Sequence, residues 1–332
     1  MSVLMAHPTA SEDFTRRADP YRRELTAHCY RMLGSIHDAE DLVQETYLRA
    51  WSAYERFEER ASMRTWLYRI ATNACLTALE SRGRRPLPTD LAEAADPARP
   101  LAENVEIPWL QPAPDTIVNA ESGDPGTVVA DRFSVRLALV AALQHLPPRQ
   151  RAVLVLRDVM RFRAAETAEA LEMTTVAVNS LLQRARAQLA QVMPREDDMT
   201  EPDSAEMRDL LDSYAAAFQN YDIAAMVDLF RSDAAWEMPP FLTWVRGPRN
   251  IVDLITTHCP AQGPGDMVMV PTRANGQPAF ALYMRDPEGE HRAFHLQVLT
   301  VRQGKVAHVS AFFDTSLFPR FGLPDTLAEL RG

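Results

Sequence analysis

Residues 147–189 read PPRQRAVLVLRDVMRFRAAETAEALEMTTVAVNSLLQRARAQL and predict two helices joined by a tight turn. The second helix carries five polar or basic side chains, Asn179, Ser180, Gln183, Arg184 and Arg186. Asn and Gln pair with adenine edges, and Arg pairs with guanine or with phosphate. This pattern is typical of a helix-turn-helix that reads the major groove of DNA, and the alternative is a helical bundle without DNA contact.

The spacing within this motif predicts which side chains face inward. Ala168 and Leu171 suit the core side of the short first helix, and Thr174 suits the N-cap of the second. The turn has Glu172-Met173 where glycine is common, and Arg163 stands where a Ser or Thr cap is common, but neither departure removes the motif. For Arg186, a phosphate contact and a structural ion pair both stay open. The side chains predicted to face DNA are Thr174, Thr175, Asn179, Ser180, Gln183, Arg184 and Arg186.

The charge distribution supports a local nucleic-acid surface. The whole chain of 332 residues carries a net charge of −10, which alone would argue against a nucleic-acid partner. Residues 131–195, however, hold ten arginines against five acids, whereas residues 196–332 carry −9 and residues 1–130 carry −6. A basic module therefore lies between two acidic ones, and the local charge is what bears on DNA.

The composition excludes several other classes of protein. Apolar residues make up 46% and charged residues 24%, which indicates a globular chain. No apolar run approaches the roughly 18 residues of a membrane span, and the N-terminus has no secretory pattern, so we expect a cytoplasmic location. Cys29, Cys75 and Cys259 have no metal-binding spacing and are expected to be reduced thiols. We therefore expect no metal and no cofactor.

The pattern along the chain separates five segments. Residues 12–85 show helical periodicity and begin one helix at "HDAEDLV", where an Asp cap and an acidic first turn are expected. Residues 86–128 are proline-rich and read as a linker, and residues 129–195 are helical again. Residues 204–318 pass from helices to strands, with Gln303-Gly304 as a hairpin turn, and residues 319–332 form a tail. The expected fold is multidomain, with two all-α domains followed by an α+β domain.

The segment "DAEDLVQETYLRAWSAYERFEERASMRTWLYRIATNACLTALESRGRR" resembles region 2 of extracytoplasmic-function sigma factors of the sigma-70 family. In that family this domain binds core RNA polymerase and melts the −10 promoter element. The resemblance implies that an acidic and apolar helix face contacts the coiled coil of the largest polymerase subunit; the alternative is a plain solvated face. The residues of this face are Asp41, Gln44, Glu45, Leu48 and Arg49.

Arginines and aromatics alternate after this face. Cationic and aromatic surfaces suit single-stranded nucleic acid, because phosphates need charge and unstacked bases need a flat partner. For Trp66, core packing remains the alternative. The residues expected to contact the −10 element are Arg56, Arg60, Ser62, Arg64, Trp66, Arg69, Asn73, Arg84 and Arg85.

The helix-turn-helix resembles region 4 of the same family, which reads the −35 element and contacts the flap of the second-largest polymerase subunit. Nothing that resembles the middle domain of larger sigma factors lies between the two regions. Within the linker, "IPWLQPAPD" (residues 107–115) is unusually apolar, and sigma factors with a C-terminal extension have a similar segment. Trp109 and Leu110 are therefore expected to dock in extended form, with an incidental hydrophobic segment as the alternative.

Residues 204–318 resemble SnoaL-like domains of the nuclear-transport-factor-2 fold, through "LLDSYAAAFQNYDIAAMVDLFRSDAAWEMPP", "VRGPRNI" and "VLTVRQGKVAHVSAFFD". Tyr214 falls at the position of the oxyanion-stabilising tyrosine in the branch related to ketosteroid isomerase. Met238 replaces the base of that branch, and Gln297 replaces its second acid. A thioether cannot abstract a proton, so we expect no turnover. Glu237, His295 and Asp314 remain as weaker catalytic candidates.

The same resemblance predicts an apolar pocket, either open to a small hydrophobic ligand or filled by its own side chains. Its expected lining residues are Tyr214, Trp236, Met238, Trp244, His295, Gln297 and Phe312. Phe318 and Phe321 are expected to dock the tail on the sigma regions.

Taken together, the sequence predicts an alternative sigma factor that binds core RNA polymerase and promoter DNA. Its acidic C-terminal domain would modulate activity through intramolecular contact with the sigma regions. Two alternatives stay open: a C-terminal enzyme or sensor for a small hydrophobic ligand, and a DNA-binding regulator that never joins polymerase.

Overall fold

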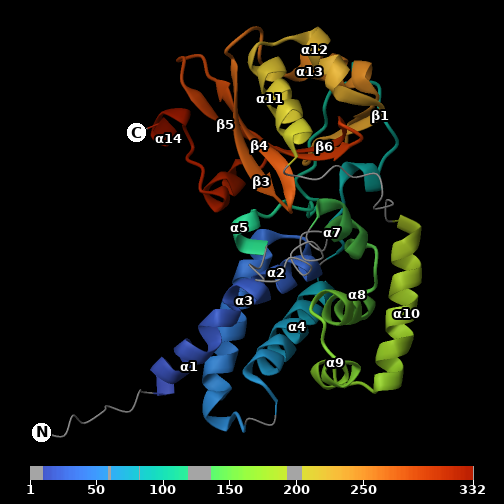
Figure 1. Cartoon of the computed structure of the whole chain (residues 1–332), viewed down its shortest axis with the longest axis vertical. Helices are drawn as coiled ribbons and strands as arrows, with labels where there is room; N and C mark the ends of the chain where they lie inside the picture. The colour runs from blue at the N-terminus through green and yellow to red at the C-terminus, as the bar shows by residue number, and fades with distance from the viewer. Residues whose placement is uncertain (1–9, 59–60, 82, 119–135, 193–203, 332) are drawn as a thin grey trace, which may run out of the picture. The chain divides into compact units, whose positions relative to one another are not determined.

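The computed structural model describes residues 10–58, 61–81, 83–118, 136–192 and 204–331 (Figure 1). The chain divides into two compact units. The first unit combines residues 1–84 with residues 116–193, and the second combines residues 85–115 with residues 194–332. The sigma-like regions thus share one unit, while most of the described linker belongs to the unit of the C-terminal domain.

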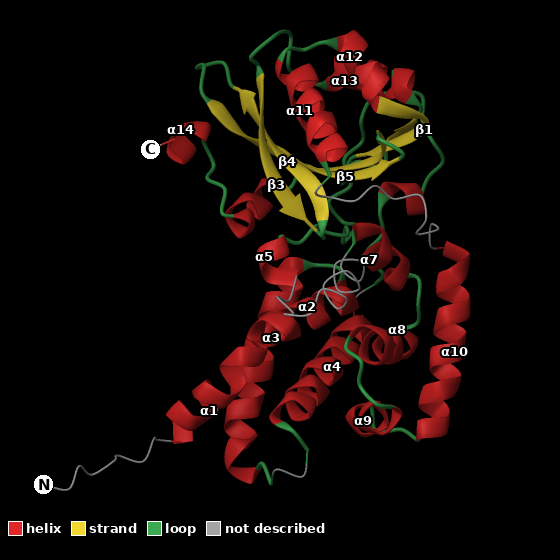
Figure 2. Cartoon of the chain, in the orientation of Figure 1, coloured by secondary structure: helices red, strands yellow, loops and turns green. Residues whose placement is uncertain are grey.

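The first unit is helical (Figure 2). Its longer helices have an apolar side that packs inward, as at Leu25, Cys29 and Met32, which are fully buried. The elements are α1 (Ala10–Ala18), a 3-10 turn (Asp19–Tyr21), α2 (Arg22–Leu33), α3 (Ile36–Ala53), a second 3-10 turn (Tyr54–Arg56), α4 (Met63–Ser81), α7 (Leu137–Gln144), α8 (Pro148–Leu154), a π turn (Val155–Val159), α9 (Ala164–Ala170) and α10 (Thr175–Val192). The short helix α5 (Asp115–Val118) begins with the last linker residue assigned to the second unit, and its other residues are assigned to the first.

The turn between α2 and α3 corrects one expected cap. Gly34 adopts φ 70°, which a residue with a Cβ rarely tolerates, and ends α2. Ser35 caps α3 because its side-chain oxygen accepts a hydrogen bond from the backbone N–H of Asp38. Asp38 was expected to be the cap but lies inside the first turn, where its charge still complements the helix dipole.

The second unit is built on a six-stranded sheet with the strand order β2-β1-β6-β5-β4-β3. All neighbouring strands are antiparallel except β1 and β6, which are parallel. The strands are β1 (Phe230–Glu237), β2 (Trp244–Arg246), β3 (Met267–Ala274), β4 (Gln277–Arg285), β5 (His291–Arg302) and β6 (Lys305–Phe312). The helices are α11 (Ala205–Gln219), α12 (Ile223–Leu229), α13 (Pro248–His258) and α14 (Leu327–Arg331), and two 3-10 turns span Pro88–Asp90 and Thr315–Phe321.

Two-residue turns fix the register of this sheet. Gln303 and Gly304 have φ values of 51° and 70° and join β5 to β6, which confirms the predicted hairpin. Asn275 and Gly276 have φ values of 57° and 67° and join β3 to β4 in the same way. Turns with two positive φ angles match the right-handed twist of the strands.

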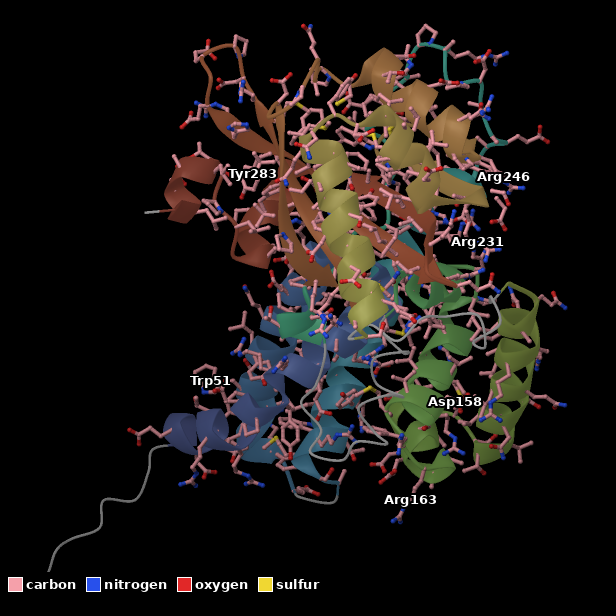
Figure 3. The ribbon with its side chains drawn as sticks, turned by 45° about the horizontal axis from the view of Figure 1, so that its top comes forward. Trp51, Asp158, Arg163, Arg231, Arg246 and Tyr283 are labelled. Atoms are coloured by element: carbon pink, nitrogen blue, oxygen red, sulfur yellow. The ribbon has the colours of Figure 1, made fainter. Side chains whose placement is uncertain are left out.

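Helices α11, α12 and α13 gather on one face of the sheet and enclose its apolar core (Figure 1). On the other face, Tyr283 of β4 (Figure 3) packs edge-on against Phe318 at a ring-centroid distance of 5.4 Å. The Tyr283 hydroxyl donates to the carbonyl of Pro324 at 2.9 Å, and the Ala293 amide donates to Asp325. The tail therefore packs on its own domain. Phe318 is fully buried there, which corrects its expected docking on the sigma regions, and Phe321 is half-buried.

Candidate nucleic-acid interface and C-terminal cavity

Helix α10 presents the predicted recognition side chains to solvent. Its N-cap is Thr174, as expected, because the Thr174 hydroxyl accepts from the Ala177 amide at 3.2 Å. Val178, Leu182 and Ala185 are buried on the opposite side of the helix. The exposed residues are Thr174, Thr175, Asn179, Ser180, Gln183, Arg184 and Arg186. The polar face is therefore held outward by an apolar stripe and by an ordered first turn.

The two unusual positions of the helix-turn-helix have structural explanations. Glu172 adopts a left-handed φ of 52°, so a non-glycine residue makes the turn where glycine is common. The backbone N–H of Arg163 donates to the Glu166 carboxylate at 2.6 Å, which satisfies the start of α9 without a Ser or Thr cap. Arg186 makes a two-pronged ion pair with Asp158 at 2.6 and 2.8 Å, so the structural reading of this residue is observed.

The predicted polymerase-binding face of α3 is solvent-accessible. Leu48 is 67% exposed and Trp51 is 53% exposed, which is unusual for large apolar side chains. Asp41, Gln44 and Arg49 are also exposed. Glu45 is half-buried and pairs with Arg49 one helical turn later. An apolar patch rimmed by charges is typical of a protein-binding surface.

The loop before α4 and the first turns of that helix hold several residues of the predicted −10 reader. Arg56 is exposed, whereas Arg60 lies outside the described residues. The Ser62 hydroxyl accepts from the Thr65 amide and so caps α4. Trp66 is half-buried and stacks on Phe57 at a ring-centroid distance of 4.6 Å. Asn73 is half-buried further along α4.

Arg64 takes part in an intramolecular contact between the two sigma-like regions. Its guanidinium forms a forked ion pair with Glu24 of α2, at 3.0 to 3.3 Å. It also lies 5.0 Å from the ring centre of Tyr68 and 4.6 Å from that of Phe162, just before α9. The positive charge of Arg64 therefore interacts with a carboxylate and two aromatic rings of the protein itself.

Other predicted cations are engaged in the same way. Arg69 pairs with Glu172 at 3.6 Å, and the Arg84 guanidinium lies 2.7 Å from His145.

Arg151 of α8 is buried and donates to the carbonyl of Met32 at the end of α2. Burial lowers the pKa of Arg151 to about 10, and carbonyl acceptors surround the side chain. Within the first unit, the helix-turn-helix thus packs against the melting-type region, which the sequence did not predict.

The linker is fixed to the C-terminal domain at its start by a buried carboxylate. Glu237, at the end of β1, accepts hydrogen bonds from the Thr89 amide at 3.3 Å and from the Thr89 hydroxyl at 2.9 Å. The same carboxylate accepts from His308 at 2.8 Å and from Ser310 at 2.7 Å. Burial alone would raise the pKa of Glu237, but the charge of His308 and the hydrogen bonds outweigh it and lower the pKa.

The middle of the linker follows the edge of the same domain. Trp244 of β2 donates its indole N–H to the Ala92 carbonyl at 2.8 Å, and the Trp244 carbonyl accepts from the Ala95 amide at 2.8 Å. His258 of α13 bonds to the carbonyl of Pro97 at 2.9 Å. The Asn104 amide donates to Pro240 at 2.9 Å.

Residues 113–115 of the linker dock on the β3–β4 hairpin. The Ala113 amide donates to the Asn275 side chain, and the Asn275 amide donates to the Ala113 carbonyl, both at 2.9 Å. Asp115 accepts from the Gly276 amide at 2.6 Å and pairs with Arg273 at 3.1 Å. The docked region therefore extends well beyond the predicted segment 107–115.

The predicted docking residues lie within this stretch. Trp109 donates its indole N–H to the Asn104 carbonyl at 2.8 Å, and its own carbonyl accepts from Arg85 at 3.0 Å. Leu110 is fully buried, and its amide donates to the Pro86 carbonyl. Residues 85 and 86 are thus bonded to residues 109 and 110, so this part of the linker folds back on itself.

The C-terminal domain encloses an apolar cavity of about 380 Å³. Of the predicted lining residues, Trp236, Met238, His295 and Gln297 line it. The others do not, which corrects the expected lining. Tyr214 is buried behind Gln297, Trp244 faces the linker, and Phe312 lines a separate groove beside Trp109. The further lining residues are Leu101, Phe218, Phe241, Leu254, Ile255, His258, Cys259, Pro260, Met267, Leu282, Phe294 and Phe313.

The weaker catalytic candidates are engaged elsewhere or neutral. Glu237 is bonded to the linker, and the Asp314 carboxylate caps the 3-10 turn at Ser316. His295 is buried, and burial lowers its pKa to about 3, so its imidazole is neutral near pH 7. No carboxylate lines the cavity among the described residues, so the cavity has no acid–base pair of the kind that isomerases use.

Comparison with known proteins agrees with this architecture. Three family profiles match: "Sigma-70 region 2" over residues 18–85, "Sigma-70, region 4" over residues 136–189 and "SnoaL-like domain" over residues 211–309. The ECF RNA polymerase sigma factor SigG of Mycobacterium tuberculosis is 59% identical over 317 residues, covering 95% of this chain and 85% of the relative. The chain is an extracytoplasmic-function (ECF) sigma factor.

A more distant relative also aligns along most of the chain. The ECF RNA polymerase sigma factor SigJ of Mycobacterium tuberculosis is 29% identical over 300 residues, covering 86% of each chain. The crystal structure of SigJ matches this sigma factor with a TM-score of 0.59, covering 95% of this chain and all of that one. At 22% identity in that alignment, the likeness shows a common fold. Across the described residues of this sigma factor, no helix combines the length and apolarity needed to cross a bilayer.

Proposed function

We propose that this sigma factor contacts core RNA polymerase through the exposed face of α3. Asp41, Gln44, Glu45, Leu48 and Arg49 form this face, and Trp51 extends it. The proposed partner is the coiled coil of the largest subunit, with the helix-turn-helix region placed at the flap of the second-largest subunit. The support is the exposure of Leu48 and Trp51. Covering large apolar side chains with a partner removes apolar surface from water, which makes the free energy of binding more favourable. A sigma factor that acts with polymerase would reside in the cytoplasm.

We further propose that α10 reads the −35 element and that α4 with its preceding loop reads the −10 element. The observation that supports this proposal is that α10 has an exposed polar face opposite a buried apolar stripe. The proposed −35 contacts are Thr174, Thr175, Asn179, Ser180, Gln183 and Arg184. Arg186 is proposed to have a structural role, through its ion pair with Asp158. The proposed −10 contacts are Arg56, Arg60, Ser62, Trp66 and Asn73, together with Arg64, Arg69, Arg84 and Arg85 once their present partners release them.

In vitro transcription with core polymerase tests this assignment. Gln183→Ala should reduce output from a cognate promoter, whereas Gln191→Ala, at an exposed position on the last turn of the same helix, should leave it unchanged. Equal output from both variants would contradict the reading role of α10.

We propose that the C-terminal domain modulates initiation by holding the linker that joins the two sigma regions. The support is that residues 85–115 fold as part of that domain and bond to it at Thr89, Ala95, Asn104 and Ala113. Docking of these residues restrains part of the chain that connects the two sigma regions.

The regulatory proposal is tested with linker-docking variants of the full chain. Trp244→Phe removes the N–H donated to Ala92, and Asp115→Ala removes the contacts to Gly276 and Arg273. Both variants should change promoter output at equal polymerase concentration. Unchanged output and unchanged polymerase affinity in both would overturn the regulatory role.

We propose that the SnoaL-like cavity binds a small hydrophobic ligand and does not convert it to a product. Met238 and Gln297 stand where related isomerases use acids, and the nearby carboxylates serve the linker and a turn. A ligand sensor is therefore favoured over an enzyme for this domain.

A further inference from the structure

We infer that the cavity is a binding site for a neutral, largely apolar molecule that presents a hydrogen-bond-accepting oxygen, and that the linker residue Leu101 senses its occupancy. The first part stands on the cavity alone. The second part rests on the proposed regulatory role of the linker.

Two buried polar atoms of the lining have no hydrogen-bond partner among the described residues. They are the indole nitrogen Nε1 of Trp236 and the ring nitrogen Nδ1 of His295. Trp236 is 3% exposed and His295 is 5% exposed. Both residues line the cavity, and a buried polar group without a partner is costly, so a bound group that reaches these nitrogens would offset that cost.

A chain of hydrogen bonds makes the His295 nitrogen a donor. The Tyr214 hydroxyl donates to Gln297 Oε1 at 2.8 Å, and Gln297 Nε2 lies 2.8 Å from His295 Nε2. An amide nitrogen can only donate, so His295 Nε2 accepts. A neutral imidazole then carries its proton on Nδ1. Trp236 Nε1 is also a donor, so both unpartnered atoms call for an acceptor.

The remaining lining restricts the charge of the ligand. Apart from His258, His295, Gln297 and Cys259, the lining residues are aliphatic, aromatic, thioether or proline side chains. No arginine or lysine lines the cavity among the described residues, so a carboxylate ligand would be buried without a counter-charge. A ketone, ester or quinone oxygen on an apolar skeleton meets both requirements.

The linker supplies part of the cavity wall. Leu101 lines the cavity, and His258, another lining residue, bonds to the Pro97 carbonyl four residues earlier in the linker. A ligand that packs against Leu101 adds contact area that exists only while the linker is docked. Binding and linker docking therefore strengthen each other, because such linkage is reciprocal.

Binding is tested on the full chain with matched ketone and hydrocarbon pairs in equilibrium dialysis. We use 1-indanone with indane and 9-fluorenone with fluorene, which differ by one accepting oxygen within each pair. One buried hydrogen bond predicts a ketone preference of about fivefold or more. Equal binding, or no binding, of ketone and hydrocarbon in both pairs would overturn the site.

Variants then identify the donors. Trp236→Phe and His295→Phe should each lower the ketone preference, while His37→Phe, a matched change outside the cavity, should keep it. Preference retained in both cavity variants would show that other groups bind the oxygen and would overturn the assignment.

The sensing step has a separate readout. The better-binding ketone should slow hydrogen exchange at the Ala95 and Asn104 amides, which donate to Trp244 and Pro240. Ketone binding with unchanged exchange at these amides would overturn the sensing step and leave the site intact. No step requires polymerase, so a failure of the proposed transcriptional role is distinguishable.

Discussion

The buried carboxylate of Glu237 permits a quantitative test of linker docking. Glu237→Gln preserves the size of the side chain but replaces one accepting oxygen with an NH₂ group among donors. The native carboxylate accepts four hydrogen bonds, two of them from Thr89. Hydrogen bonds to a charged group contribute about 1.5–3 kcal/mol and neutral ones about 1 kcal/mol. Each oxygen accepts two of these bonds, so the substitution removes two of them and predicts a loss of about 3–6 kcal/mol.

Native-state hydrogen exchange with increasing urea measures this loss on the amides of β1 and β6. Thr89→Val removes one of the four bonds and should reduce the stability by about 1–2 kcal/mol. Asp233→Asn is a matched control on the same strand, because its carboxylate is exposed and pairs locally with Arg231. The control should stay within about 0.5 kcal/mol of the wild type.

The lowered pKa of Glu237 predicts the direction in which the unfolding free energy changes with pH. The folded pKa of Glu237 lies below its ordinary value of 4.5, so the unfolded chain binds a proton more readily. The stabilisation is therefore fully present above about pH 4.5 and is lost as the pH falls through the folded pKa. Glu237→Gln should remove this part of the acid dependence. A variant with wild-type stability and an unchanged acid profile would refute the reasoning.

Three further predictions concern other sites. Leu48→Ala should weaken core polymerase binding about tenfold in a fluorescence titration, while the unfolding free energy changes by no more than about 0.5 kcal/mol because Leu48 is exposed. Gln183→Ala should lower discrimination for the −35 element about tenfold, measured against a scrambled element, and equal loss on both sequences would exclude base readout. His28 is buried with a pKa lowered to about 3, so stability should fall as the pH drops from about 6.5 to 3. His28→Gln should flatten that slope by about 1.4 kcal/mol per pH unit in urea unfolding, and an unchanged slope would contradict the lowered pKa.

Periodicity and turn chemistry predicted the local structure well. The apolar stripe of α10, the Thr174 cap and the Gln303-Gly304 hairpin follow from interactions within a few residues, which a sequence pattern records directly. The same reasoning missed the Ser35 cap, because an acidic first turn made Asp38 look equally suitable.

Long-range packing was not predictable in this way. The partner of Arg64 is Glu24, 40 residues away, and Phe162 approaches from the other sigma-like region. The linker was recognised as apolar only at residues 107–115, since most of its docking uses backbone groups that carry no sequence signal. The residues that line the cavity were predicted only in part. Strand positions predict which face of the sheet a side chain lies on, but not whether the side chain reaches the cavity.

The packing of residues 85–115 on the C-terminal domain also bears on stoichiometry. A separate regulatory protein acts according to its abundance and is titrated by synthesis or degradation. Here the linker and the domain that holds it are made in equal numbers, at an effective concentration of the order of millimolar. Expression level therefore cannot alter their ratio, and any inducing signal must change the strength of the contact itself.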